Sequence, residues 1–335
     1  MIRSKLHGTE ESLIFWGKAV EITTKEVQSI APSALSAAFK EECNQYFRLC
    51  ALGRSTSLSS QHTSQAHDLL FRVRATLERS IEASARRAIK ANSSLSQTIS
   101  LAGGPIFGIS KKQGTSVRLP LASCQPTRLC APGCYAHDAL DATPNSIVRG
   151  ALNGLLASVY CENISWRADI LRAMEKPTRR AIAAALAEQA AAKSAGYERG
   201  ARIRLAHVGE ATAYPDFTND LANLIKKLSL NAVTPVIYTR HKDAKLLDSN
   251  SMVINFTIDS SSKSRLKWKP KGARLVASAF KGIAIVDASV NFVEHHRWTS
   301  VLVTTKGNLC PVTVPENSLS TCDEAKCNLC FEREL

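Results

Sequence analysis

The sequence predicts an α/β fold, a partial or irregular (β/α) barrel with a helical N-terminal region and a cysteine-rich C-terminal tail. Short apolar strands alternate with helical segments after residue 200, as they do in a parallel sheet. Such a pattern fits an open sheet or a full or partial barrel, and because the strand candidates are too few for eight strands, a partial or irregular barrel is expected. We divide the chain into residues 1–110, 111–297 and 298–335.

The N-terminal region, residues 1–110, is expected to be mainly helical. Apolar residues recur at helical spacing over 64–91, with arginine and lysine between them. Segment 12–38 has a similar pattern, which Pro32 interrupts. The basic face of the 64–91 helix either lies in solvent or follows a nucleic acid backbone, and solvent is the simpler interpretation.

The later elements are predicted from apolar runs and helix formers. A strand over 116–121 leads into a group of cysteines, and helical patterns return from 147 to 195, with Pro177 predicted to start the alanine-rich helix. The remaining elements are strands at 202–207, 235–239, 252–258, 274–277, 283–286 and 298–305, and helices at 218–228 and 242–247.

Three cysteines, Cys124, Cys130 and Cys134, lie within eleven residues. Prolines and a glycine between them oppose helix and strand, so the backbone turns and the thiols can surround one centre. A [4Fe–4S] cluster held by three thiolates keeps one iron open to a substrate or cofactor. The alternative is that these cysteines are small buried apolar residues.

A second cysteine set closes the chain: Cys310, Cys322, Cys327 and Cys330. Four thiolates can saturate one tetrahedral zinc ion or a second [4Fe–4S] cluster, and both remain open. The N-terminus lacks a signal-peptide pattern and no apolar run is long enough to cross a membrane, so we expect a cytoplasmic protein without a membrane partner. In that compartment cysteines serve as ligands, or stay inert, more often than they form disulfides.

The net charge of +14 makes nucleic acid the first partner to consider. The alternative is that the charge serves solubility. A basic run with an internal tryptophan could hold phosphates and stack one base, or could be a solvated loop. The candidate nucleic-acid residues are Lys263, Arg265, Lys267, Trp268, Lys269 and Lys271.

Polar residues lie at or just beyond several predicted strand ends, the edge where α/β barrels keep their active sites. Such a carboxylate can orient a ribose hydroxyl, and an arginine can bind a carboxylate or phosphate through two hydrogen bonds. For each residue a capping or salt-bridging role is the alternative. The catalytic candidates are Glu210, Tyr238, Arg240 and Asp259, and the cofactor-binding candidates are His207, Gly209 and Glu210.

Five segments occur in an order that resembles a phage and plasmid family called gene product 88: 130–136, 202–210, 237–240, 254–259 and 327–331. That family resembles the radical S-adenosylmethionine barrel enzymes, and the resemblance covers about residues 117–335. It implies a [4Fe–4S] cluster at the three-cysteine site and S-adenosylmethionine as a cofactor.

Two departures from these families are visible in the sequence. The usual radical signature is C-x3-C-x2-C, whereas the spacing here is C-x5-C-x3-C. Use of the cofactor is therefore implied by the resemblance and not by the spacing. Where the gene product 88 family has Gly-Asp, this chain has Gly209-Glu210, which keeps a carboxylate.

Two hypotheses follow from these observations. The first is an iron–sulfur enzyme of the radical type, encoded by a mobile element, that acts on nucleic acid or a nucleotide. The second is a non-enzymatic, zinc-stapled DNA- or RNA-binding protein of a mobile element. Iron content separates the two hypotheses.

Overall fold

The structure is a computed structural model of the whole chain. It describes residues 71, 74–83, 85–87, 89, 95–110, 114–127, 130, 144–196, 199–259, 261–280 and 290–294. The predicted elements at 12–38, 283–286 and 298–305 lie outside these residues.

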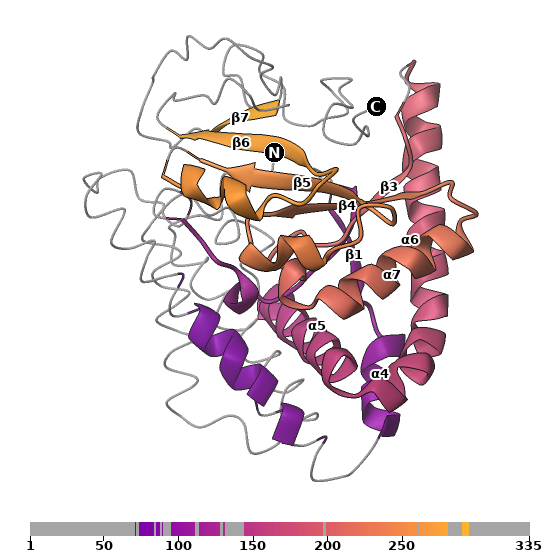
Figure 1. Cartoon of the computed structure of the whole chain (residues 1–335). Coiled ribbons are helices and arrows are strands. Elements are labelled where there is room, and N and C mark those ends of the chain that lie inside the picture. The colour runs from indigo at the N-terminus through magenta and orange to yellow at the C-terminus, as the bar shows by residue number, and fades with distance from the viewer. Residues whose placement is uncertain are drawn as a thin grey trace, which may run out of the picture.

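The described chain forms one open, mostly parallel sheet, which confirms the predicted α/β class (Figure 1). Strand β1 is antiparallel to β2, all later neighbours are parallel, and the sheet does not close into a barrel. The strands lie side by side in chain order: β1 (Phe107–Ser110), β2 (Gly114–Val117), β3 (Arg202–Arg204), β4 (Thr234–Thr239), β5 (Val253–Ile258), β6 (Arg274–Phe280) and β7 (Val290–Glu294).

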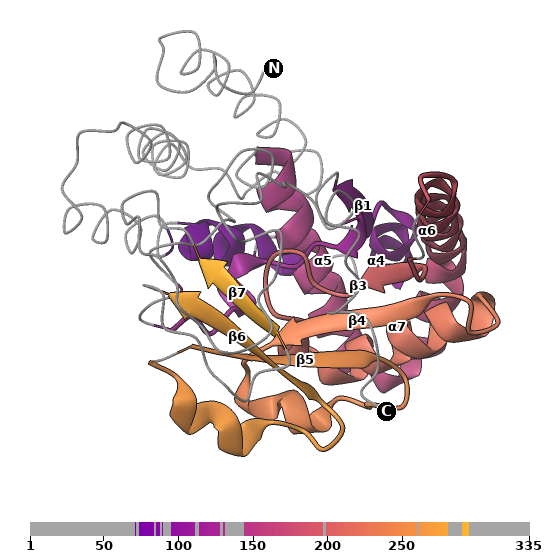
Figure 2. The same cartoon turned by 90° about the horizontal axis from the view of Figure 1, so that it is seen from above.

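The helices between the parallel strands cover one face of the sheet. Crossovers between neighbouring parallel strands are right-handed, so a sheet whose strands follow the chain order places its connections on the same side. Figures 1 and 2 show α5 and α7 on this side, and α6 packs against β1, β2 and β3. The helices are α4 (Leu95–Gly103), α5 (Pro144–Glu162), α6 (Arg167–Ser194) and α7 (Pro215–Leu228).

The two faces of the sheet differ because side chains alternate along a strand. On the helix side, Ile203, Ile237 and Phe256 are buried in the main core together with Leu155 of α5 and Leu221 of α7. The opposite face carries polar side chains from neighbouring strands, namely Arg202, Arg204, Tyr238, Asn255 and Arg274. All six residues of β5 are buried, as expected for a strand inside a parallel sheet.

The predicted helix over 64–91 is confirmed where the structure describes it, at 74–83 and 85–87. Its apolar residues Leu77, Ile81 and Ala85 join the main core under the sheet. α4 lies within residues 1–110, which were predicted to be mainly helical, whereas β1 was not predicted from the sequence. Within the described residues, no helix has both the length and the apolar character needed to span a membrane.

The prediction that a helix starts at Pro177 is wrong. The helical stretch consists of α5 and α6, separated by a 3-10 turn at Ile164–Trp166, and α6 starts at Arg167. Proline inside a helix removes only one main-chain hydrogen bond donor and crowds one turn. The buried residues Ile170 and Ala181, on either side of Pro177, anchor the helix in the core.

Gly209 allows the loop after β3 to approach the chain that leaves β2. Its φ is +80°, a region that favours glycine, and an added Cβ would lie 2.5 Å from the carbonyl oxygen of Pro120 and 2.8 Å from the carbonyl carbon of Leu119. Nearby, the amide of Leu119 donates to the carbonyl of Val208 at 3.1 Å. These contacts fix the loops after the first two parallel strands against each other.

We expect Gly209→Ala to destabilise the fold more than Gly196→Ala. Gly196 has φ +81° but no atom within 4 Å of an added Cβ, so alanine there carries only the backbone cost of about 1–2 kcal/mol. At Gly209 the backbone clash adds to that cost, for a total of about 3 kcal/mol or more. Urea unfolding of both variants tests this, and equal losses would contradict it.

Candidate functional site

The cysteine loop follows β2 and starts at the carboxyl edge of the sheet. A short 3-10 turn, η2 (Leu121–Ser123), ends directly at Cys124. Buried Glu78 accepts a hydrogen bond from the amide of Ala122 at 2.8 Å. The hydroxyl of Ser123 accepts from the amide of Glu210 at 2.8 Å. The start of the loop is therefore held by the helix at 74–83, through Glu78, and by the loop after β3, through Glu210.

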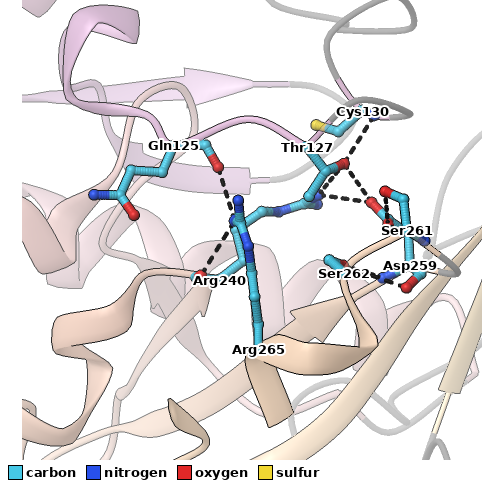
Figure 3. Close-up of polar contacts among 8 residues, drawn as sticks. All are labelled: Gln125, Thr127, Cys130, Arg240, Asp259, Ser261, Ser262 and Arg265. Atoms are coloured by element: carbon cyan, nitrogen blue, oxygen red, sulfur yellow. Dashed lines mark hydrogen bonds and ion pairs between the residues drawn. The ribbon is translucent and has the colours of Figure 1, made fainter. Parts of the chain in front are cut away.

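Thr127 connects the middle of the cysteine loop to the end of β5 (Figure 3). Its hydroxyl donates a short hydrogen bond to the carboxylate of Asp259. The same hydroxyl accepts from the amide of Cys130 at 3.0 Å. One side chain thus joins the second cysteine of the loop to a buried carboxylate at the end of the sheet.

Asp259 is a fully buried carboxylate with donors on both oxygens. Oδ1 accepts from the amide of Ser261 at 2.9 Å and from its hydroxyl at 2.7 Å, while Oδ2 accepts from Thr127. Burial alone raises the pKa of Asp259, but hydrogen bonds from Thr127, Ser261 and Ser262 and the charge of Arg240 lower it below its ordinary value. Asp259 is therefore the anion that organises this edge.

Two arginines complete the network. Nη1 of Arg240, just after β4, lies 3.4 Å from the carboxylate of Asp259 and 3.4 Å from the hydroxyl of Thr127. Nη1 of Arg265 donates to the carbonyl of Gln125 in the cysteine loop at 3.0 Å. It also lies 3.5 Å from the carbonyl oxygen of Arg240. Figure 3 shows both guanidinium groups between the loop and the strand ends.

The guanidinium of Arg240 lies in the electric field of both described cysteines of the loop. Burial lowers the pKa of Arg240, but electrostatic interactions with Cys130, Asp259 and Cys124, largest first, outweigh burial and raise it. The pKa of Arg265 is lowered by burial and then by the charge of Arg240. Two cations thus lie beside one carboxylate and two thiol groups, which suits anionic sulfur ligands.

Glu210 is buried in the loop after β3, close to the backbone of Arg240. As N-cap of the turn Ala211–Ala213, it accepts from the amide of Thr212 at 3.1 Å. Burial raises the pKa of Glu210, although hydrogen bonds from Thr212, Thr239 and the backbone of Arg240 oppose this. The hydroxyl of Thr212 also donates to that of Thr239 at 2.8 Å. The carboxylate therefore has a capping role in the structure.

The remaining strand-end candidates lie around this network. His207 is buried after β3, and its amide donates to the carbonyl of Val117 at 2.7 Å. Tyr238 points to the face of the sheet opposite α5 and α7, where the guanidinium of Arg204 lies 4.5 Å from its ring centre. The structure therefore brings Arg240 and Asp259 together and leaves Tyr238 outside their network.

Two of the seven predicted metal ligands, Cys124 and Cys130, are described, and both are half-buried free thiols. Among the described residues, no group of three histidine, cysteine or acidic side chains is placed to hold a metal ion. The other predicted ligands, Cys134, Cys310, Cys322, Cys327 and Cys330, lie outside the described residues.

The predicted nucleic-acid residues form part of the same edge. Lys263, Arg265, Lys267 and Trp268 belong to a 3-10 helix, η9 (Lys263–Trp268), that follows β5. Trp268 is half-buried, with the guanidinium of Arg265 5.7 Å and the ammonium of Lys267 5.9 Å from its ring centre. Through its bond to Gln125, Arg265 joins this basic helix to the cysteine loop.

Sequence reasoning missed Thr127, Ser123 and Glu78, all of which hold the cysteine loop. Thr127 and Ser123 lie inside or beside the cysteine motif, and this position was the only feature of the sequence that could have pointed to their role. Glu78 carried a weaker signal, an acidic residue in the apolar repeat of the 64–91 helix. It forms a buried ion pair with Arg74, with 2.9 Å between Nε and Oε1.

In comparisons with protein-family models, curated proteins and solved structures, nothing matches this chain. The functional argument therefore depends on the geometry of this edge and on the residues themselves.

We expect Thr127→Val to release the cysteine loop. Loss of the hydroxyl removes one bond to Asp259 and one from the amide of Cys130, which should cost about 1–3 kcal/mol of unfolding free energy. Hydrogen exchange at the Cys130 amide should accelerate. Thr218→Val is the matched control, because that buried hydroxyl donates to Ala211 in another part of the fold. Unchanged exchange at Cys130 in Thr127→Val would contradict the interpretation.

We expect Glu210→Gln to gain stability relative to wild type as pH rises. The folded pKa is raised, so the contribution of Glu210 is fully present below about pH 4.5 and is lost as pH rises through the folded pKa. Glutamine keeps an acceptor for Thr212 and does not titrate. Urea unfolding at about pH 4 and 7 measures the difference. Asp248→Asn is the control, since the lowered pKa of Asp248 predicts a constant difference across that range.

Proposed function

We propose that this chain is an iron–sulfur protein of the radical S-adenosylmethionine type, encoded by a phage or plasmid, that acts on nucleic acid or a nucleotide. The observation that carries the proposal is the loop bearing Cys124 and Cys130, held at the carboxyl edge of a parallel sheet beside the cation of Arg240.

The order of the strands supports a partial barrel. Strands β2 to β7 are parallel and neighbours in chain order, the arrangement from which (β/α) barrels are built. The cysteine loop follows β2, the first parallel strand. The loops after β3, β4 and β5 contact the cysteine loop, and we assign the reaction site to this edge of the sheet.

The two described cysteines of the loop support the proposal of an iron–sulfur cluster. Cys124 and Cys130 lie on one loop, and Cys134 is the proposed third ligand, so that one iron stays open. A thiolate-bound cluster carries negative charge, which Arg240 and Arg265 offset. When bound, the cluster supplies an electron and the open iron binds S-adenosylmethionine.

The surrounding residues take supporting roles in this proposal. Arg240 and Asp259 hold the loop and set the charge beside the cluster, while Gly209 lets the loop after β3 come close. We assign S-adenosylmethionine binding to His207, Gly209 and Glu210, which lie in the loop after β3. The four cysteines of the tail bind zinc or a second [4Fe–4S] cluster, and we place the protein in the cytoplasm.

Metal analysis of anaerobically purified protein tests the proposal. We expect brown protein with an absorbance band at about 400 nm and about four irons per cluster. Replacing Cys124, Cys130 and Cys134 together by alanine should remove one cluster and abolish reductive cleavage of S-adenosylmethionine. Cys161→Ala is the control, because that half-buried thiol packs against the main core.

The same measurement addresses the alternative of a zinc-stapled, non-enzymatic nucleic-acid-binding protein. Colourless protein that contains only zinc and binds nucleic acid without iron would favour the alternative. The tail cysteines and the net charge of +14 are compatible with both functions.

A further inference from the structure

Two short helices at the carboxyl edge form a basic rim beside the cysteine loop. The rim consists of η8 (Lys242–Leu246), after β4, and η9, after β5, and the two pack against each other. Both belong to the orange part of the chain in Figures 1 and 2. Their exposed ammonium groups come from Lys242, Lys245, Lys263 and Lys267.

Three acidic residues lie near the rim. Asp259 is buried and holds the cysteine loop, and Asp248 accepts from the amide of Asn250 at 2.9 Å and from the hydroxyl of Ser251. Asp243 of η8 lies 3.5 Å from Nδ1 of His241, but that nitrogen accepts a hydrogen bond from the amide of Asp243, so it does not neutralise the carboxylate. The four exposed lysines outnumber Asp243 and Asp248, so the net charge of the rim is positive and its complement is a polyanion.

The rim also exposes large apolar side chains between its lysines. Leu246 of η8 is 51% exposed and Leu266 of η9 is 41% exposed. A duplex presents phosphates on its outside and keeps its bases stacked, whereas a single strand can place bases against apolar or aromatic side chains. Half-buried Trp268 lies in the same helix as Leu266.

We propose that η8 and η9 together bind a single-stranded nucleic acid, with lysines on its phosphates and Leu246 and Leu266 against its bases. Arg265 connects the bound nucleic acid to the cysteine loop, because it lies in η9 and donates a hydrogen bond to the carbonyl of Gln125. The inference names the substrate class of the proposed function and rests on it for its biological role. Binding itself requires no metal.

Charge removal from the rim tests the proposal in the full chain as purified, with a fluorescent single-stranded oligonucleotide at several salt concentrations. Replacing the four exposed lysines by glutamine should weaken binding at least about tenfold at about 0.1 M salt. It should also lower the slope of log K against log salt by up to about 2.8. The control removes four exposed cations of α6, Lys176, Arg179, Arg180 and Lys193, and should retain most of the affinity.

The apolar part has its own test. Leu246→Ala with Leu266→Ala should weaken single-strand binding about threefold or more and leave the salt slope unchanged. Ile109→Ala with Ile164→Ala is the control, since both side chains are exposed elsewhere. Duplex of the same sequence should bind more weakly than the single strand.

Several outcomes would overturn the inference: no binding by wild type, equal losses in the rim and α6 variants, preference for duplex, or preference for phosphatidylserine vesicles. Iron content distinguishes it from the proposed function. If the rim variant loses binding but the protein never contains iron, single-strand binding by the rim is supported and the proposed iron–sulfur function is refuted. If the protein contains the cluster but the rim variant binds as tightly as wild type, the proposed function is supported and the inference about the rim is refuted.

Discussion

The buried carboxylate of Asp259 is the interaction on which this edge of the molecule depends. Its donors come from Thr127 of the cysteine loop, Arg240 after β4, and Ser261 beside it in the chain. A buried anion is tolerated only when donors and a cation surround it, so the loop and both strand ends must meet there. The placement of Cys130 follows directly, because its amide bonds to the same threonine hydroxyl.

That meeting point exists because the parallel strands follow the chain order. Their carboxyl ends share one edge, so the loops after β2, β3, β4 and β5 converge although they are far apart in sequence. Close approach is also needed, and Gly209 supplies it where its lack of a Cβ admits the backbone of Leu119 and Pro120. Glu78 then ties the N-terminal helix to the same loop.

Much of this fold could be predicted from local pattern, because apolar runs that are buried on both faces, such as β5, leave a clear signal. Arg240 and Asp259 could be placed at strand ends for the same reason. Thr127 could not, because its partner is 132 residues away and nothing local distinguishes it from a turn residue. Tyr238 was predicted to act together with Arg240, yet it lies within β4, where its side chain contacts Arg204 on the face of the sheet opposite α5 and α7.

Arg265 belongs to two parts of the edge, and this links them electrostatically. Its guanidinium holds the cysteine loop through Gln125, lies beside Arg240, and contacts the ring of Trp268 in the basic rim. Neighbouring like charges are stabilised by any anion placed near both. On the proposed function, a negative cluster on the loop and a phosphate on the rim both offset the same pair of arginines. If both anions bind as proposed, each would change the electric field that the other experiences, and binding at the rim would shift the reduction potential of the cluster.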